Sequence, residues 1–182
     1  MSCWPSTSSC MIDGTMDFTN RVSQTLHDEH RQTIALVERL EQLIARRWGD
    51  DPPNAGDPGV ARLLTDLTTW VESEINRHFD FEEEQLFSYL AAAGDAAIGA
   101  SLTDEHHVIR PIGARIATLA HAASVRPLDT VEWNEFRRLG QELCESIQGH
   151  VQKEEMALLP VLEDEMDPDT EVRLYQQYVD NM

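Results

Sequence analysis

Two histidines are each followed four residues later by a glutamate: His78 precedes Glu82, and His150 precedes Glu154. On an α-helix this spacing places the two side chains on one face. Each pair can therefore offer a neutral imidazole nitrogen and a carboxylate oxygen to the same cation. Because mixed imidazole and carboxylate ligands suit iron, manganese or zinc, the pattern predicts a metal site.

Two further histidines extend the pattern, because each ends an Asp-Glu-His run on an expected helix. A single buried histidine is usually a hydrogen-bonded core residue, but six ionisable residues on apolar helix stripes need a common partner. We expect each glutamate to bridge two metal ions, each held by two histidines, with a hydroxide or oxide offsetting the remaining positive charge. The candidate ligands are His30, His78, Glu82, His106, His150 and Glu154.

Four helices are expected to carry these residues, and no stretch has the alternating pattern of a strand. Their expected ranges are 17–48, with Asp17 or Thr19 as N-cap, 59–93, 101–123, with a start as early as 96, and 130–166. The connections between them predict an all-α, up-down-up-down antiparallel four-helix bundle with a short C-terminal helix.

The sequence also repeats itself at a nearly constant interval. His106 follows His30 by 76 residues, while His150 follows His78, and Glu154 follows Glu82, by 72 residues. Two helical hairpins related by a pseudo-twofold axis would bring the four signature regions together.

The length of 182 residues fits one domain. We expect a disordered leader over 1–16, the bundle over 17–166, and a tail or short helix over 167–182. The three cysteines do not make a disulfide framework, the start lacks the features of a signal peptide, and no run of 18 apolar residues occurs. A reducing cytoplasm is therefore the expected location.

The charge balance excludes some classes of partner. With 33 Asp and Glu against 14 Lys and Arg, the net charge is −19. Such a surface repels phosphate backbones and anionic lipid, so we expect neither a nucleic-acid partner nor a membrane partner. The sequence does not indicate any protein partner.

Taken together, these motifs resemble the hemerythrin family in its bacterial HHE cation-binding form. The resemblance covers about residues 20–165, and it implies a four-helix bundle that holds a non-haem centre of two iron ions. It also implies O2, peroxide or nitric oxide as the small ligand, and the same six residues as iron ligands. Its matching pieces are Asp28-Glu29-His30, His78-Phe79-Asp80-Phe81-Glu82-Glu83, Asp104-Glu105-His106 and His150-Val151-Gln152-Lys153-Glu154-Glu155.

The sequence departs from this family at one position. Oxygen-carrying hemerythrins place a second histidine four residues after the first on the third helix, where this chain has Arg110. His27, one turn before His30, is a further candidate ligand. We expect Glu83, Glu84 and Glu155 on the solvated face, with Glu83 as the alternative ligand if the helix phase differs. Candidates to orient the histidines from outside are Asp28, Glu29, Asp104 and Glu105.

Three functions fit this sequence. One is a protein that binds or senses a small ligand or handles iron, and another is an oxidoreductase that activates O2 or peroxide. The third is a structural metal that only clasps the bundle. The other helical di-iron class, the ferritin-like proteins, is excluded because it requires Glu-x-x-His motifs, which are missing here.

Overall fold

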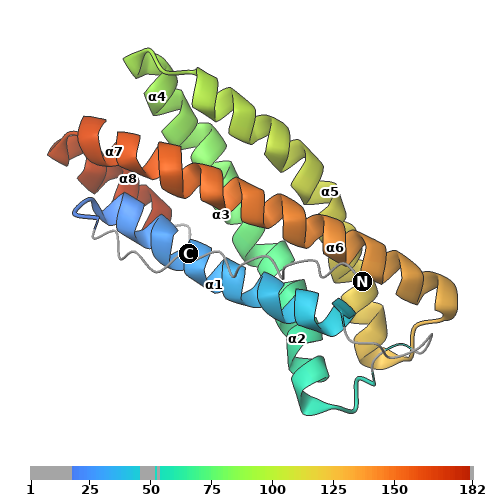
Figure 1. Ribbon diagram of the computed structural model, residues 1–182. Coiled ribbons are helices and arrows are strands. Elements are labelled where there is room, and N and C mark those ends of the chain that lie inside the picture. Colours follow the sequence, from blue (N-terminus) through green and yellow to red (C-terminus); the bar gives the residue numbers. More distant parts are fainter. Residues whose placement is uncertain (1–17, 46–51, 53, 181–182) are drawn as a thin grey trace, which may run out of the picture.

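Five continuous helices make up the described part of the chain, which in this computed structural model comprises residues 18–45, 52 and 54–180 (Figure 1). No residue in those ranges lies in a strand, so the predicted all-α class is confirmed. The predicted leader and the expected end of the first helix at 46–48 lie outside the described residues. Two of the five helices contain π-helical turns, which are labelled η. The first helix is α1 (Arg21–Ala45), and the second consists of α2 (Pro58–Thr69), η1 (Trp70–Ile75), α3 (Asn76–Phe81), η2 (Glu82–Leu86) and α4 (Phe87–Ala93). The third is α5 (Ala97–Val125), the fourth consists of α6 (Thr130–Lys153), η3 (Glu154–Leu158) and α7 (Leu159–Glu165), and the fifth is α8 (Pro168–Asp180).

The first helix begins later than predicted, because a different residue caps it. The side-chain oxygen of Asn20 accepts hydrogen bonds from the backbone N–H groups of Val22 at 2.9 Å and Ser23 at 3.3 Å. Thr19, one of the two predicted caps, instead donates its backbone N–H to Glu163 at 2.8 Å. Asn20 therefore satisfies the first free N–H groups of α1.

The other helix ends follow from ordinary capping chemistry. Asp57 caps α2, while Asp129 and Glu132 form a reciprocal capping box at the start of α6. Gly94 ends α4 with φ of 102°, a left-handed conformation that glycine adopts without steric cost.

The long helices pack along one another into a bundle (Figure 1). In it α1 packs against α6 and α2, and α5 packs against α2 and α6, while α8 lies against α1. No helix within the described ranges is long and apolar enough to cross a membrane.

The core divides into two apolar clusters with a layer of ionisable residues between them. Along α1, His30 lies between Leu26 of one cluster and Val37 of the other. Along α5, His106 lies between Leu102 and Ile109, which belong to different clusters in the same way. The bundle thus buries the candidate ligands at one level, with apolar packing above and below.

Candidate metal centre

Both candidate glutamates stand at the start of a π-helical turn. η2 begins at Glu82 and η3 begins at Glu154, whereas His78 and His150 lie in the preceding α-helical segments. The spacing from histidine to glutamate therefore remains α-helical, and the turn widens only after the carboxylate. Such π-turns occur frequently at functional sites.

The six candidate residues converge into two overlapping groups whose donor atoms lie within 4.8 Å of one another. Both groups share the two glutamates, and each adds two histidines from different helices. The glutamate side chains and that of His106 are fully buried. One group is His30, His78, Glu82 and Glu154, and the other is Glu82, His106, His150 and Glu154.

Glu82 faces a histidine of each group with a different oxygen. Its Oε1 lies 3.2 Å from His78 Nε2, on the same helix, and its Oε2 lies 3.3 Å from His106 Nε2. A carboxylate in this position can bind one ion through each oxygen.

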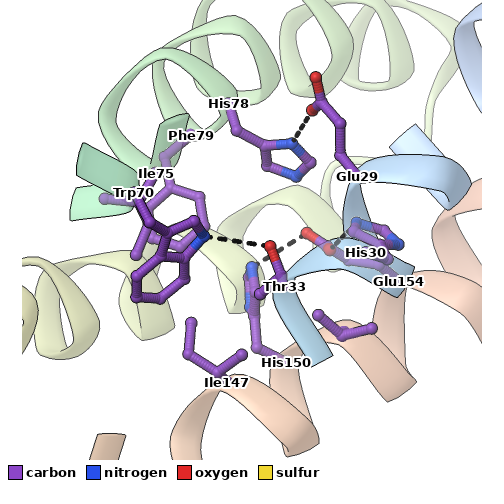
Figure 2. A pocket seen from close by; sticks show the side chains of 11 residues that line it. Glu29, His30, Thr33, Trp70, Ile75, His78, Phe79, Ile147, His150 and Glu154 are labelled. Carbon is purple, nitrogen blue, oxygen red and sulfur yellow. Dashed lines mark hydrogen bonds and ion pairs between the residues drawn. The ribbon is translucent and has the colours of Figure 1, made fainter. Parts of the chain in front are cut away.

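Glu154 has the equivalent arrangement on the other side of the bundle. Its Oε2 lies 2.9 Å from His30 Nε2, and its Oε1 lies 3.0 Å from His150 Nε2 (Figure 2). Both glutamates thus lie between the two pairs of histidines, with one oxygen near a histidine of each pair.

Unsatisfied polar atoms show that these residues fit a cation. His30 Nε2 and both carboxylate oxygens of Glu82 and Glu154 are buried and make no hydrogen bond, although each lies 2.9–3.3 Å from a ring nitrogen or carboxylate oxygen of the same cluster. Buried polar atoms nearly always have a partner, because desolvation without one is costly. Five such atoms converge here on one small region, and a divalent cation would satisfy all of them. The buried His and Glu groups can therefore bind metal.

Each of the four histidines also contacts a second carboxylate through its other ring nitrogen, Nδ1. If Nδ1 carries the proton and donates it to the carboxylate, Nε2 is left with a lone pair directed at the centre. The four pairs are His30–Glu155 at 2.6 Å, His78–Glu29 at 2.8 Å, His106–Glu83 at 2.8 Å and His150–Glu105 at 2.9 Å.

These outer carboxylates repeat with the sequence duplication. Glu83 and Glu155 directly follow the two candidate glutamate ligands, and Glu29 and Glu105 directly precede His30 and His106. Each outer carboxylate belongs to a different helix from the histidine that it contacts, so the four pairs also join helices.

The carboxylates around the centre stabilise positive charge there, either as a proton on a histidine or as a bound cation. Because a cation binds the neutral imidazole, metal binding displaces that proton. Burial would lower the pKa of His30, but the carboxylates of Glu154 and Glu155 raise it to about 9. Burial would raise the pKa of Glu29, but hydrogen bonds from His78 and Tyr178 and the charge of Arg77 lower it to about 2.

The remaining residues that the sequence analysis singled out differ in whether they contact the candidate ligands. His27 belongs to neither group, and its Nδ1 lies 2.9 Å from Glu155 Oε2. Of the four residues expected to orient histidines, Glu29 and Glu105 do so, while Asp28 and Asp104 are exposed.

Two of the outer carboxylates contradict the sequence prediction. Glu83 and Glu155 were expected on the solvated face, but each accepts a hydrogen bond from a candidate ligand. Only Glu84 of that set is exposed. The signal that could have identified them is the Glu-Glu pair at both copies of the motif.

Arg110 occupies the position of the second histidine of oxygen-carrying hemerythrins, and both terminal nitrogens of its guanidinium are hydrogen-bonded outside the donor groups. It donates to Asn76 at 3.0 Å, to Asp80 at 2.7 Å and to Glu83 at 3.3 Å. Arg110 therefore contacts the outer carboxylate of His106 and takes no part in either group of donors.

A small cavity of about 30 Å³ adjoins the centre on the side of His30 and His78 (Figure 2). Space of this size holds one or two water-sized molecules. Its walls are mostly apolar, apart from the site residues and the hydroxyl of Thr33. The apolar lining residues are Trp70, Ile75, Phe79, Ile147 and Val151.

Comparison with known proteins agrees with this geometry. A sequence model of the family described as Hemerythrin HHE cation binding domain matches residues 21–162. The matched part contains all six candidate ligands and ends before α8. No match was found among curated proteins.

Proposed function

Because the chain belongs to the Hemerythrin HHE cation-binding domain family, we propose that it holds two iron ions and binds O2, nitric oxide or peroxide at them. The observation that carries this proposal is the placement of Glu82 and Glu154. Each glutamate has one oxygen near a histidine of the His30–His78 pair and the other oxygen near a histidine of the His106–His150 pair. Each ion would take two histidines and share both carboxylates. When bound, iron supplies coordination sites and electrons for such small molecules.

The up-down-up-down order of the four long helices is part of this proposal. The neighbours α2 and α5, α5 and α6, and α6 and α1 support it, as do the short connections at 94–96 and 126–129. In that order His30, His78, His106 and His150 come from successive helices, which suits a centre shared by all four.

The size of the cavity supports a small ligand over an organic substrate. About 30 Å³ accommodates a small molecule of two or three bonded heavy atoms but not a sugar, an amino acid or an aromatic ring. Apolar walls around it would exclude bulk water from the bound molecule. Ligand binding therefore agrees better with the site than oxidation of an organic compound does.

Thr33 supplies a polar group at the wall of this cavity. Its Oγ1 accepts a hydrogen bond from Trp70 Nε1 at 3.1 Å, which fixes the hydroxyl (Figure 2). Five other helical threonines donate their hydroxyls to the backbone carbonyl four residues earlier; they are Thr25, Thr65, Thr68, Thr103 and Thr118. Thr33 makes no such bond within the described residues, so its proton is free to be donated to a molecule in the cavity.

A second candidate function is the decomposition of peroxide. The observation that favours it is Arg110, whose bonds to Asp80 and Glu83 leave the His106 half of the site with two histidines instead of three. Fewer protein ligands leave more positions for a reactive small molecule. This function uses the same six ligands.

The test is a spectroscopic titration of protein loaded with Fe(II) under anaerobic conditions. A binding protein should develop an absorption band with O2 or nitric oxide that reverses on degassing. Irreversible bleaching by O2, together with oxygen evolution from added peroxide, would instead support the second function. A loaded protein that responds to none of the three molecules would contradict both.

Variants of Thr33 test the assigned hydrogen bond. With azide as the probe, Thr33→Val should bind more weakly than wild type, by about five- to tenfold, because a hydrogen bond of about 1–1.4 kcal/mol is lost. Thr33→Ser, which keeps the hydroxyl, is the matched control and should bind azide almost normally. Equal affinities for the two variants would remove Thr33 from the proposed site.

A further inference from the structure

The C-terminal helix α8 reaches the outer part of the metal centre through one side chain. Tyr178 donates its hydroxyl to Glu29 Oε2 across 149 residues of sequence. Its side chain is buried, and its ring lies 4.4 Å from that of Phe81, centroid to centroid. The guanidinium of Arg77 lies over the same ring, 4.8 Å from its centroid.

Glu29 accepts from three donors at once. His78 Nδ1 lies 2.8 Å from Oε2, the oxygen that also receives the hydroxyl of Tyr178, and Arg77 donates to Oε1 at 2.9 Å. The direction in which this carboxylate faces His78 is therefore set jointly by Arg77 and Tyr178. A group that fixes the outer carboxylate also fixes the imidazole bonded to it.

The duplicated half of the site provides an internal comparison. Glu105, the counterpart of Glu29, accepts from His150 Nδ1 at 2.9 Å and from Lys153. Among the described residues it receives no hydrogen bond from α8. Its side chain is 32% exposed, against 19% for Glu29. Helix α8 thus covers one of two otherwise equivalent carboxylates.

Other contacts hold α8 against the helix that carries Glu29. Glu171, near its start, accepts from the backbone N–H of Arg21 at 3.0 Å and from its side chain at 2.8 Å. Leu174 is buried one turn before Tyr178. The helix therefore contacts α1 both near its start and near its end, and it lies beyond the residues that the family match covers.

We propose that Tyr178 is a positioning residue for His78, acting through Glu29, and that docking of α8 and filling of the metal centre are coupled. The inference rests on the metal centre of the proposed function. When His78 binds an ion, its Nδ1–H becomes a better donor to Glu29, which holds the carboxylate in the orientation that the hydroxyl of Tyr178 contacts. Coupling of two binding equilibria is reciprocal, so a docked α8 retains metal and bound metal retains α8.

The experiment uses the full chain loaded with Fe(II), with Tyr178→Phe as the variant. This change keeps the ring packed on Phe81 and removes only the hydroxyl. Tyr175→Phe is the matched control, because Tyr175 lies on the same helix and has no part in the contact with Glu29. The first measurement is the rate at which excess chelator removes iron. It should rise about tenfold in Tyr178→Phe and change less than twofold in Tyr175→Phe.

The second measurement is hydrogen exchange of the α8 amides, with and without iron. In wild type and Tyr175→Phe, iron should slow exchange over 168–180, and in Tyr178→Phe this effect should disappear. A purely structural role of Tyr178 would speed exchange equally in both states and leave the effect of iron unchanged. That result, or equal iron release from Tyr178→Phe and wild type, would overturn the inference. A wild-type protein that takes up no metal would overturn the proposed function as well, so the two failures are distinguishable.

Discussion

Glu155→Gln should weaken iron binding, although Glu155 is not one of the six candidate ligands. Its Oε1 lies 2.6 Å from His30 Nδ1 and its Oε2 lies 2.9 Å from His27 Nδ1, and the side chain is only 10% exposed. Glutamine has nearly the same shape, but its amide nitrogen cannot accept a hydrogen bond. One of the two histidines therefore loses its acceptor, and the other loses an anionic partner.

The expected size of the effect follows from those contacts. A hydrogen bond that involves a charged group contributes about 1.5–3 kcal/mol, and each 1.4 kcal/mol corresponds to a factor of ten in affinity. Loss of one such bond at His30 predicts a decrease of about 10- to 100-fold, the range typical of outer-sphere changes at metal sites.

The assay is competition for Fe(II) against a chromophoric chelator under anaerobic conditions, with circular dichroism as a check that the helices are intact. Asp28→Asn is the matched control, because Asp28 is an exposed carboxylate two residues before His30 in the Asp-Glu-His motif. It should bind iron within twofold of wild type. A folded Glu155→Gln protein with unchanged affinity would refute the assignment of Glu155 as the partner of His30.

Three further changes test the fold around the site. Phe79→Ala should lower the free energy of unfolding of the metal-free protein by about 3–5 kcal/mol, since the buried Phe79 ring stacks on His106 at 3.7 Å; a loss below 1 kcal/mol in urea unfolding would contradict this packing. Gly94→Ala should cost about 1–2 kcal/mol in the same assay, because φ is 102°, and an unchanged midpoint would argue against the left-handed turn. Glu132→Gln should lower the thermal midpoint at pH 7, because bonds from Arg126 and the backbone of Asp129 lower the pKa of Glu132 to about 2. This stabilisation is complete above the ordinary pKa of 4.5 and is lost as the pH falls toward 2, so the difference between Glu132→Gln and wild type should shrink on acidification; a constant difference would contradict it.

The convergence of the six candidate ligands could be predicted because helical geometry links sequence spacing to direction. His78 and Glu82 lie four residues apart, and the duplication places His150 and Glu154 in the same relation. Burial of all six at one level of the bundle followed from the apolar residues on both sides of them. The family and the all-α class could therefore be predicted from the sequence.

The contacts of the outer carboxylates with the histidines were harder to predict from the sequence, for physical reasons. A uniform helical period placed Glu83 and Glu155 on the solvent side, but the π-turns that begin at the preceding glutamates change the direction of the following residues. The contact of Tyr178 with Glu29 joins residues 149 positions apart, and no local sequence pattern predicts it. Thr19 binds Glu163, likewise a contact distant in sequence, while Asn20 caps α1.

The most direct test of the proposed metal centre is the iron content of the purified chain and of its Glu82→Ala and His150→Ala variants. Wild type should contain about two irons per chain. Glu82→Ala should lose most of both, because Glu82 belongs to both groups of donors, and His150→Ala should lose most of its iron as well. Metal-free wild type after anaerobic loading, or full iron content in both folded variants, would contradict the assignment.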